Sequence, residues 1–302
     1  MGIVLGPNQY GKAEVRVVAV DRSSPRHTLV DLNVSSSLRG DFSAAHTAGD
    51  NGHVLATDTQ KNTVFAFARE GVGSPEEFGL RLARHFAGAY EWISGARVAV
   101  DSYGWERIPV GGAGHDHAFR KGGAEVRTAV VTVHEGRAHV LAGLTGLVVL
   151  KTTGSEFWGF PRDRYTTLAE TRDRILATAV TARWRYATGA EPDFDGTFAG
   201  VRGTLLETFA STHSLALQQS LYAMGRAVLE RHADVAEIRM SMPNRHHFLQ
   251  DLSAFGLDNP PDGTGPVVYH ADDRPYGLIE GSVLRDDAAP ADIAWEGTPG
   301  FC

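Results

Sequence analysis

The chain has 302 residues, of which 42% are hydrophobic and 22% are charged, so it can form one large globular domain or two medium ones. Its formal net charge is -7 and it holds no long run of arginine or lysine, which argues against nucleic acid or an anionic membrane as its main partner. The only cysteine, Cys302, excludes an intrachain disulfide and a zinc site built from cysteine ligands. No apolar run approaches the length of a membrane span.

The first half predicts two strands, two helices and two more strands. The expected strands cover residues 12–20, 27–38, 96–105 and 125–134, and the expected helices cover residues 57–71 and 74–86. Asp58 is the candidate N-cap of the first helix and Gly71 its candidate C-cap. Ser74, Pro75 and Glu77 have the spacing of a capping box with proline at the first helical position, so they predict the start of the second helix.

The second half predicts a similar order of elements. Strands are expected at residues 146–151, 175–187, 236–243, 267–271 and 277–284, with a long helical region between the second and the third of them. In this region, Leu217, Leu221, Met224 and Val228 recur at helical spacing and predict one buried face. The repeated order indicates an α+β fold with antiparallel sheets. The acidic segment of residues 286–302 is expected to be irregular or loosely attached.

Two adjacent histidines stand out in the stretch SMPNRHHFLQDL, residues 241–252. In an extended segment the side chains alternate between faces, so Asn244 shares a face with His246, whereas His247 lies on the other. Neighbouring histidines placed in this way cannot easily ligate one metal ion, and the spacing favours an Asn–His polar pair instead. The simpler interpretation, in which His246 only satisfies buried backbone groups, stays open at this point.

The pair His115 and His117 is the better candidate for metal binding, because residues two apart share one face of a strand. A usable site needs at least three ligands, and nothing nearby offers an obvious third, although Glu125 and His134 are possible. Isolated pairs of this kind are more often structural, so the role of His115 and His117 is left open. No glycine-rich phosphate-binding motif is present, so nicotinamide, flavin and nucleotide-phosphate chemistry lose support.

An aromatic stretch at residues 155–176, SEFWGFPRDRYTTLAETRDRIL, combines Phe157, Leu168 and Arg174. A phenyl ring, an aliphatic side chain and a planar guanidinium could together hold a flat anionic ligand, by ring stacking and by a two-point contact. A buried aromatic cluster beside a surface salt bridge is the simpler explanation, and on this stretch alone it is the better one.

Five blocks, taken together and in this order, resemble the urate oxidase (uricase) family: YGKAEVRV, ATDTQKNTVFAFA, SEFWGFPRDRYTTLAETRDRIL, ALQQSLY and SMPNRHHFLQDL. The resemblance runs from Tyr10 to near Arg285. It implies two tandem tunnelling-fold (T-fold) units, residues 1–140 and 141–302, each with an antiparallel four-stranded sheet and two helices. It further implies that two subunits close a barrel and that two barrels stack into a homotetramer, with active sites at the subunit interfaces.

The resemblance also implies the reaction, in which urate, dioxygen and water give 5-hydroxyisourate and hydrogen peroxide without a metal or an organic cofactor. The residues that match the family's site are Lys12, Thr57, Asp58, Phe157, Leu168, Arg174, Leu217, Gln218, Asn244 and His246. By this resemblance, Arg174 and Gln218 clamp the purine, Phe157 stacks on it and Leu168 packs beside it. Leu217, which stands where relatives often have valine, contributes a backbone N–H.

The remaining residues carried over by the resemblance handle protons and oxygen. Thr57 and Asp58 come from the partner subunit, and their place at a helix start suits an anionic ligand. Lys12, Thr57 and His246 resemble a proton-relay triad. Asn244 resembles the residue that holds dioxygen or water above the purine ring.

Two other interpretations remain open. One is a metal-dependent T-fold hydrolase of pterins or purines, for which cysteine ligands are missing here. The other is a purine-binding paralogue without activity, against which the joint presence of Lys12, Thr57, Asn244 and His246 argues. Many eukaryotic relatives end in the peroxisomal address Ser-Lys-Leu, whereas this chain ends in Gly-Phe-Cys, so a cytoplasmic setting in a bacterium is expected, with no nucleic acid or membrane partner.

Overall fold

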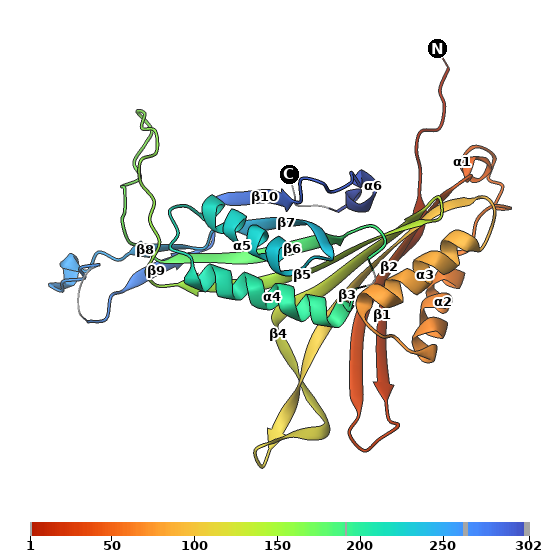
Figure 1. The fold of residues 1–302 in the computed structure, drawn as a ribbon, viewed down its shortest axis with the longest axis horizontal. Helices are drawn as coiled ribbons and strands as arrows, with labels where there is room; N and C mark the ends of the chain where they lie inside the picture. The colour runs from red at the N-terminus through yellow and green to blue at the C-terminus, as the bar shows by residue number, and fades with distance from the viewer. Residues whose placement is uncertain (1, 191, 262–264, 299–302) are drawn as a thin grey trace.

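The computed structural model describes residues 2–190, 192–261 and 265–298, which are built around one long antiparallel sheet (Figure 1). The strands are β1 (Tyr10–Asp21), β2 (Thr28–Gly40), β3 (Ile93–Val110), β4 (Ala113–His134), β5 (Arg137–Lys151), β6 (Leu176–Tyr186), β7 (Val235–Pro243), β8 (His246–Leu249), β9 (Tyr269–Asp272) and β10 (Leu278–Leu284). The helices are α1 (Ser43–Ala48), α2 (Thr57–Glu70), α3 (Pro75–Gly88), α4 (Phe194–Ser211), α5 (Leu217–Arg231) and α6 (Asp292–Trp295), with a 3-10 turn at Ser253–Phe255. Each strand and helix expected from the sequence has a counterpart.

Eight strands form the sheet in the order β1-β2-β3-β4-β5-β6-β7-β10, and every neighbouring pair is antiparallel. The first four strands, β1 to β4, end at residue 134, and the other four begin at residue 137 or later. The two sets join at the tight turn of Glu135 and Gly136, whose φ angles are 48° and 75°. These observations confirm the α+β class with two antiparallel four-stranded sets. The boundary between residues 140 and 141 lies inside β5 and stays a prediction.

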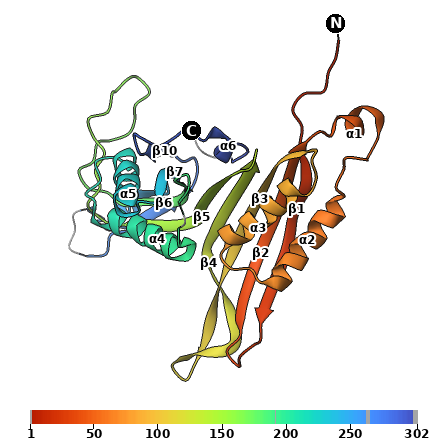
Figure 2. The same cartoon turned by 45° about the vertical axis from the view of Figure 1, so that its right-hand side comes forward.

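One face of the sheet is apolar and covered by helices. Helices α2 and α3 lie along the strands of the first set, and α4 and α5 lie over the second set (Figures 1 and 2). Phe78, Leu82 and Phe86 of α3 are fully buried, as their helical spacing predicts. The four residues predicted to form the buried face of α5 are 0% to 5% exposed, so that prediction is confirmed.

The other face of the sheet carries many polar side chains. Because side chains alternate along a strand, Asp101 of β3 and Thr128 of β4 point away from the helices, and so do Arg183 of β6 and Arg239 of β7. Burial raises the pKa of the Asp101 carboxyl, and the charge of Arg183 partly opposes this effect. The sheet therefore has one face for packing and a second, polar face.

The ends of helices α2 and α3 correct one prediction and confirm two. Helix α2 begins at Thr57 with Ala56 as its N-cap, so the prediction that Asp58 is the N-cap is wrong. Asp58 lies in the first turn instead, where the helix dipole favours a carboxylate, and it accepts a hydrogen bond from Lys61 over 2.5 Å. Gly71 is the C-cap of α2, as predicted, with φ at 122°. The capping box of α3 is present in full.

The C-terminal segment, residues 286–298, is anchored on the polar face of the sheet, which corrects the expectation of a loose attachment. Ala294 and Trp295 of α6 pack against Val130 of β4 and Leu141 of β5. These two strand residues point away from the helices, because their neighbours in sequence belong to the helix-covered cores. The acidic, proline-containing composition of the segment gave no indication that Trp295 would pack on this apolar patch. Residues 299–302 of the predicted tail lie outside the described residues.

Polar contacts fasten the same segment to both strand sets. The indole Nε1–H of Trp295 donates to the Glu237 carboxylate on β7 over 3.1 Å. Farther along, Arg39 of β2 pairs with Glu296 at 2.5 Å. The Arg97 guanidinium of β3 also donates to the Thr298 hydroxyl, over 2.6 Å. The C-terminal segment therefore crosses the sheet from β7 to β2.

Candidate active site

A short ribbon of backbone hydrogen bonds holds the aromatic stretch in place. The N–H of Phe157 donates to the carbonyl of Thr171, and the N–H of Thr171 returns the bond, each over 2.9 Å. The N–H of Arg174 donates to the carbonyl of Ser155 over 2.9 Å. On the other side, Ser155 forms a parallel bridge with Ser214, three residues before α5. Phe157 and Arg174 therefore lie close to the segment that leads into α5.

The guanidinium of Arg174 has a donor that no described residue satisfies. Its central carbon lies 5.1 Å from the centre of the Phe157 ring, and its buried Nε has no hydrogen-bond partner in the part of the chain that the structure describes. Burial lowers the pKa of this guanidinium, because desolvation disfavours the charged form. A buried donor without a partner typically costs about 1–3 kcal/mol. This arrangement favours an anionic ligand at Arg174.

Leu217 and Gln218 are the first two residues of α5, whose N-cap, Ala216, offers no side chain that could cap the helix. The N–H groups of a first helical turn lack partners within the helix and carry partial positive charge. Leu217 is 2% exposed, whereas the side chain of Gln218 is exposed. A backbone N–H and an amide group are thus available to an anion beside the aromatic stretch.

The segment after β7 brings Asn244 next to the strand that Arg174 precedes. Asn244 forms an isolated antiparallel bridge with Thr178 of β6. The N–H of Arg245 donates to the carbonyl of Ala177 over 2.9 Å. Since Ala177 follows Arg174 by three residues, Asn244 and Arg174 belong to neighbouring segments.

The other predicted residues of the second half are less enclosed. His246 begins β8, and its ring stacks on that of Phe248 with 5.6 Å between ring centres. The Nδ1 atom of His247 contacts the carbonyl of Arg245 at 3.1 Å, which suits a structural role. Leu168 is 53% exposed in the connection between β5 and β6. Its side chain is therefore accessible to a ligand.

The predicted residues of the first half form a second group. Lys12 lies on β1 beside a β-bulge, where Glu14 has a φ of 57°. Thr57 and Asp58 are the first two residues of α2, and both are exposed. The charge of Lys12 helps to lower the pKa of the Asp58 carboxyl, after the larger effect of the hydrogen bond from Lys61. Lys12 and the start of α2 are thus close enough to interact.

Sequence reasoning missed two polar residues beneath this group. The amide oxygen of Gln60, a fully buried residue, accepts a hydrogen bond from the Ser36 hydroxyl over 2.8 Å, and its nitrogen donates to the carbonyl of Leu55 over 3.2 Å. The N–H of Lys12 donates to the same Ser36 hydroxyl over 3.3 Å. Gln60 therefore ties the β1 bulge to the first turns of α2. No sequence signal separates this glutamine from any other polar residue of a helix.

The two groups of predicted residues lie toward opposite edges of the sheet. Lys12 belongs to β1, the outermost strand on one side, whereas Asn244 follows β7, which neighbours the outermost strand on the other side (Figure 1). Neighbouring strands lie about 4.8 Å apart, so the six steps from β1 to β7 correspond to roughly 29 Å across a flat sheet. A single chain therefore does not bring the two groups together.

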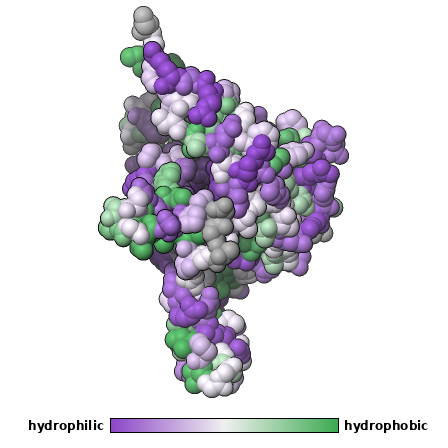
Figure 3. Space-filling view, turned by 90° about the vertical axis from the view of Figure 1, so that its left-hand side faces the viewer, coloured by the Kyte–Doolittle hydropathy of each residue, from purple (hydrophilic) through white to green (hydrophobic). Residues whose placement is uncertain are grey.

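The structure does not support a metal site at His115 and His117. Their ring centres lie 4.5 Å apart, on a hairpin of β3 and β4 that projects downward in Figure 1 and contributes to the lobe at the bottom of Figure 3. Glu125 accepts two hydrogen bonds from Arg202, at 2.7 and 2.8 Å, and His134 ends β4 far from the hairpin tip. Among the described residues, no three His, Cys, Asp or Glu side chains are arranged to hold a metal ion.

Comparison with known proteins decides the family. The model of the family described as Uricase matches residues 8–132 and 140–280. The chain belongs to the uricase family. Similar relatives include a uricase of Arthrobacter globiformis, 58% identical over 99% of this chain and 96% of the relative, and a uricase of Aspergillus flavus, 38% identical over 92% of this chain and 95% of the relative.

Solved structures agree with this assignment. The crystal structure of uricase from Arthrobacter globiformis has a TM-score of 0.90 and covers 96% of this chain and 98% of its own. A urate oxidase from Bacillus sp. TB-90, at 26% identity, has a TM-score of 0.78 and covers 92% of this chain and 100% of its own. These matches confirm the resemblance seen in the five sequence blocks and the T-fold that it implied.

Family membership makes the chain an oxidoreductase of purine breakdown and sets aside the metal-dependent hydrolase. In residues 2–190, 192–261 and 265–298, no helix combines the length and the apolar character that a membrane crossing requires.

Proposed function

We propose that the chain oxidises urate with dioxygen and water to 5-hydroxyisourate and hydrogen peroxide, without a metal or an organic cofactor. Membership of the uricase family supports this reaction. In the structure, the observation that carries the proposal is Arg174, a partly buried guanidinium beside the Phe157 ring whose Nε finds no acceptor among the described residues. A flat, electron-rich anion offers an acceptor to the guanidinium and a face to the ring.

In this proposal, urate lies against the ring of Phe157, with Leu168 beside it. Arg174 makes a planar two-point contact with one edge of the purine, and the Gln218 amide contacts another. The N–H of Leu217 adds a donor at the start of α5. Together these groups hold the anion in one orientation, which removes much of the entropic cost of reaching the reacting geometry.

The chemistry that follows depends on proton removal. Ground-state dioxygen is a triplet, so its direct two-electron reaction with closed-shell urate is spin-restricted, whereas a urate ring that has lost enough protons donates electrons one at a time. Lys12, Thr57 and His246 relay the protons, and Asn244 holds dioxygen or water above the ring. Urate gives up two electrons and two protons, dioxygen takes them to become hydrogen peroxide, and the oxidised ring then adds water as a hydroxyl at C5.

The proposal places the complete site between two subunits. Strands β1 and β10 each have only one neighbour within the described sheet, so each has an edge that another strand can pair. Pairing β1 of one chain with β10 of a second chain, and the reverse, would close a barrel whose lumen is lined by the polar face. It would bring Lys12 and Thr57 of one chain toward Arg174 and His246 of the other. Two such barrels stack into the homotetramer.

Complementation of inactive variants tests the shared site. Thr57→Ala and Arg174→Ala should each abolish most activity, because each removes one group from every site. In a dimer of one Thr57→Ala chain and one Arg174→Ala chain, one site holds both defects and the other holds none. Random exchange of equal amounts makes about half of the dimers mixed, so about a quarter of all sites should be intact. Recovery near that level, with unmixed variants as controls, supports the interface. No recovery despite verified subunit exchange would place each site within one chain.

The activity itself is tested by incubating the purified protein with urate and following the loss of its ultraviolet absorbance together with peroxide release. We expect one peroxide for each urate consumed, with no added cofactor and with the same rate in the presence of a chelator. Loss of activity on chelation would overturn the metal-free part of the proposal. A folded protein that binds urate without oxidising it would instead be the inactive paralogue.

We also infer a cytoplasmic setting in a bacterium. The support is the 58% identical uricase of Arthrobacter globiformis, which is bacterial. Fractionation of the source cells, with an antibody against the chain, should find it with cytoplasmic markers, and recovery with the membrane or outside the cell would contradict the inference.

A further inference from the structure

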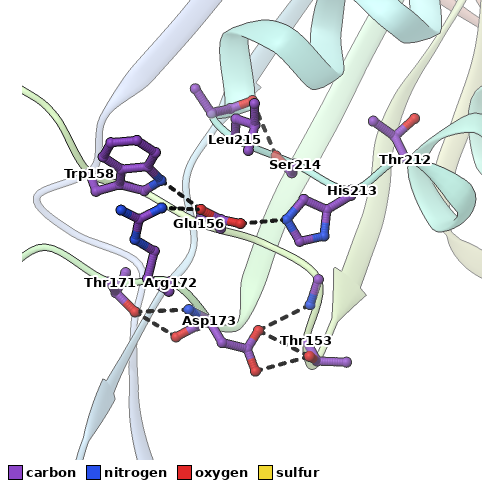
Figure 4. A network of polar contacts seen from close by, with 12 residues as sticks. Thr153, Glu156, Trp158, Thr171, Arg172, Asp173, Thr212, His213, Ser214 and Leu215 are labelled. Carbon is purple, nitrogen blue, oxygen red and sulfur yellow. Dashed lines mark hydrogen bonds and ion pairs between the residues drawn. The ribbon is translucent and has the colours of Figure 1, made fainter.

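The carboxylate of Glu156 gathers side chains from three segments of the candidate site (Figure 4). It accepts a hydrogen bond from Nε1 of Trp158 over 2.6 Å and another from Nε2 of His213 over 2.7 Å. Arg172 forms an ion pair with it at 3.7 Å and also lies over the Trp158 ring, 3.5 Å from its centre. The Glu156 side chain is 16% exposed, against 69% for Arg172 and 57% for His213, so the carboxylate is the inner member that the others share.

Each of these three segments carries part of the proposed urate clamp. Trp158 directly follows the stacking ring, Arg172 stands two residues before the clamping guanidinium, and His213 stands four residues before the start of α5. Backbone bonds follow the same path. The N–H of Glu156 donates to the carbonyl of Ser214 over 2.7 Å, and the N–H of Ser214 donates to the carbonyl of Gly154 over 2.9 Å.

We propose that Glu156 is a positioning residue for urate: its carboxylate fixes the stacking ring, the clamping guanidinium and the start of α5 relative to one another. The inference rests on the proposed function and adds a residue outside the predicted site. Glu156 acts through its neighbours. It fixes the distances between the Phe157 ring, the Arg174 guanidinium and the start of α5, and the purine binds between these groups.

A second carboxylate of the same loop, that of Asp173, has different partners from the carboxylate of Glu156. Asp173 accepts hydrogen bonds from the Thr153 hydroxyl, at 2.9 and 3.0 Å, and from the N–H of Gly154 at 3.0 Å (Figure 4). Asp173 therefore holds the two ends of the loop together, at residues 153–154 and 173. Glu156 instead joins the loop to the segment before α5. The bonds from His213 and then from Trp158 hold the pKa of the Glu156 carboxyl below its usual value, so it is ionised at neutral pH.

The test compares three variants of the full chain. Glu156→Ala removes the carboxylate, and Glu156→Gln keeps a hydrogen-bonding group of the same length. The control, Glu230→Gln, neutralises an exposed carboxylate on α5 that pairs with Arg226 at 2.7 Å. For each protein, kcat and KM for urate are measured, together with the Kd of a purine analogue that cannot be oxidised, the Tm and the oligomeric state.

We expect Glu156→Ala to raise KM and the Kd of the analogue by about 10–100-fold, because a displaced guanidinium loses a charge-assisted hydrogen bond to the anion. The kcat value should change by less than about threefold, since the lost contacts bind substrate and transition state alike. Glu156→Gln should recover most of the affinity, and Glu230→Gln should match the wild type. If Glu156→Ala does not assemble, His213→Ala, which removes one exposed donor to the carboxylate, should shift KM in the same direction.

The outcomes separate this inference from the proposed function. The positioning role would be overturned if Glu156→Ala left KM and the analogue affinity unchanged. If Glu156→Ala does not assemble, the same result in His213→Ala would overturn it. A lowered Tm with no change in KM or Kd would overturn it as well, since it would show a merely structural residue. In both cases a wild type that oxidises urate would leave the proposed function standing. A wild type that does not oxidise urate would refute the function itself.

Discussion

Replacing Trp295 with alanine should release the C-terminal segment and destabilise the protein. The ring is 7% exposed, and it packs against Val130 and Leu141. Its Nε1 donates to Glu237 over 3.1 Å, and the guanidinium of Arg239 lies 4.1 Å from its centre. Truncating a buried tryptophan to alanine typically costs about 3–5 kcal/mol, which includes about 1 kcal/mol for the hydrogen bond and about 0.5–1 kcal/mol for the cation–π contact.

The position of Trp295 near one end of the chain lowers this figure. The segment can detach instead of leaving a cavity, so the expected loss is about 3 kcal/mol, at the lower end of the range. For a chain of this size, 1 kcal/mol corresponds to about 2 °C, so Tm should fall by about 6 °C. Trp295→Phe keeps most of the packing and loses the hydrogen bond, so its Tm should fall by about 2 °C.

The assay is calorimetry at fixed pH and fixed chain concentration, because assembly into the proposed homotetramer would make Tm depend on concentration. The control is Phe255→Ala, which truncates a ring that is 73% exposed and should leave Tm unchanged. Limited proteolysis should also cut the C-terminal segment faster in Trp295→Ala than in the wild type. A Tm for Trp295→Ala equal to that of Phe255→Ala, with equal proteolysis, would refute the anchoring of this segment.

Three further predictions concern the site. Arg174→Lys keeps the charge but loses the planar fork, so urate binding should weaken by about 1.5–3 kcal/mol; an unchanged KM would remove Arg174 from the clamp. Lys12→Met should lower kcat by about 10²–10⁴-fold, with KM nearly unchanged, and near-wild-type turnover in the intact assembly would contradict the relay. The pKa of Glu156 is lowered in the folded state, so its stabilisation is complete above the ordinary glutamate pKa and is lost as pH falls through the lowered value. Tm should therefore fall more steeply on acidification in the wild type than in Glu156→Gln, and parallel curves would contradict this.

The parts of the fold that sequence predicted well are those in which one local pattern has one structural outcome. Helical spacing in α3 and α5 predicted their buried faces, and the capping box at Ser74 predicted where α3 begins. Asp58 was assigned wrongly because a carboxylate is favoured both as an N-cap and in the first turn, by a side-chain bond in one case and by the helix dipole in the other. The C-terminal segment was missed because Trp295 packs on Val130, a contact between residues far apart in the sequence.

The same distinction applies to the candidate site. Its ten predicted residues came from motifs, which are local, whereas Glu156 and His213 meet only because the fold brings residues 57 positions apart together. The motifs gave no physical reason for the proposed subunit interface. That reason lies in the sheet, since Lys12 is on one outermost strand and Asn244 lies beside the other. In the proposed barrel, pairing these edges with those of a second chain would satisfy their backbone groups and complete the site in the same step, so assembly and activity would depend on the same contacts.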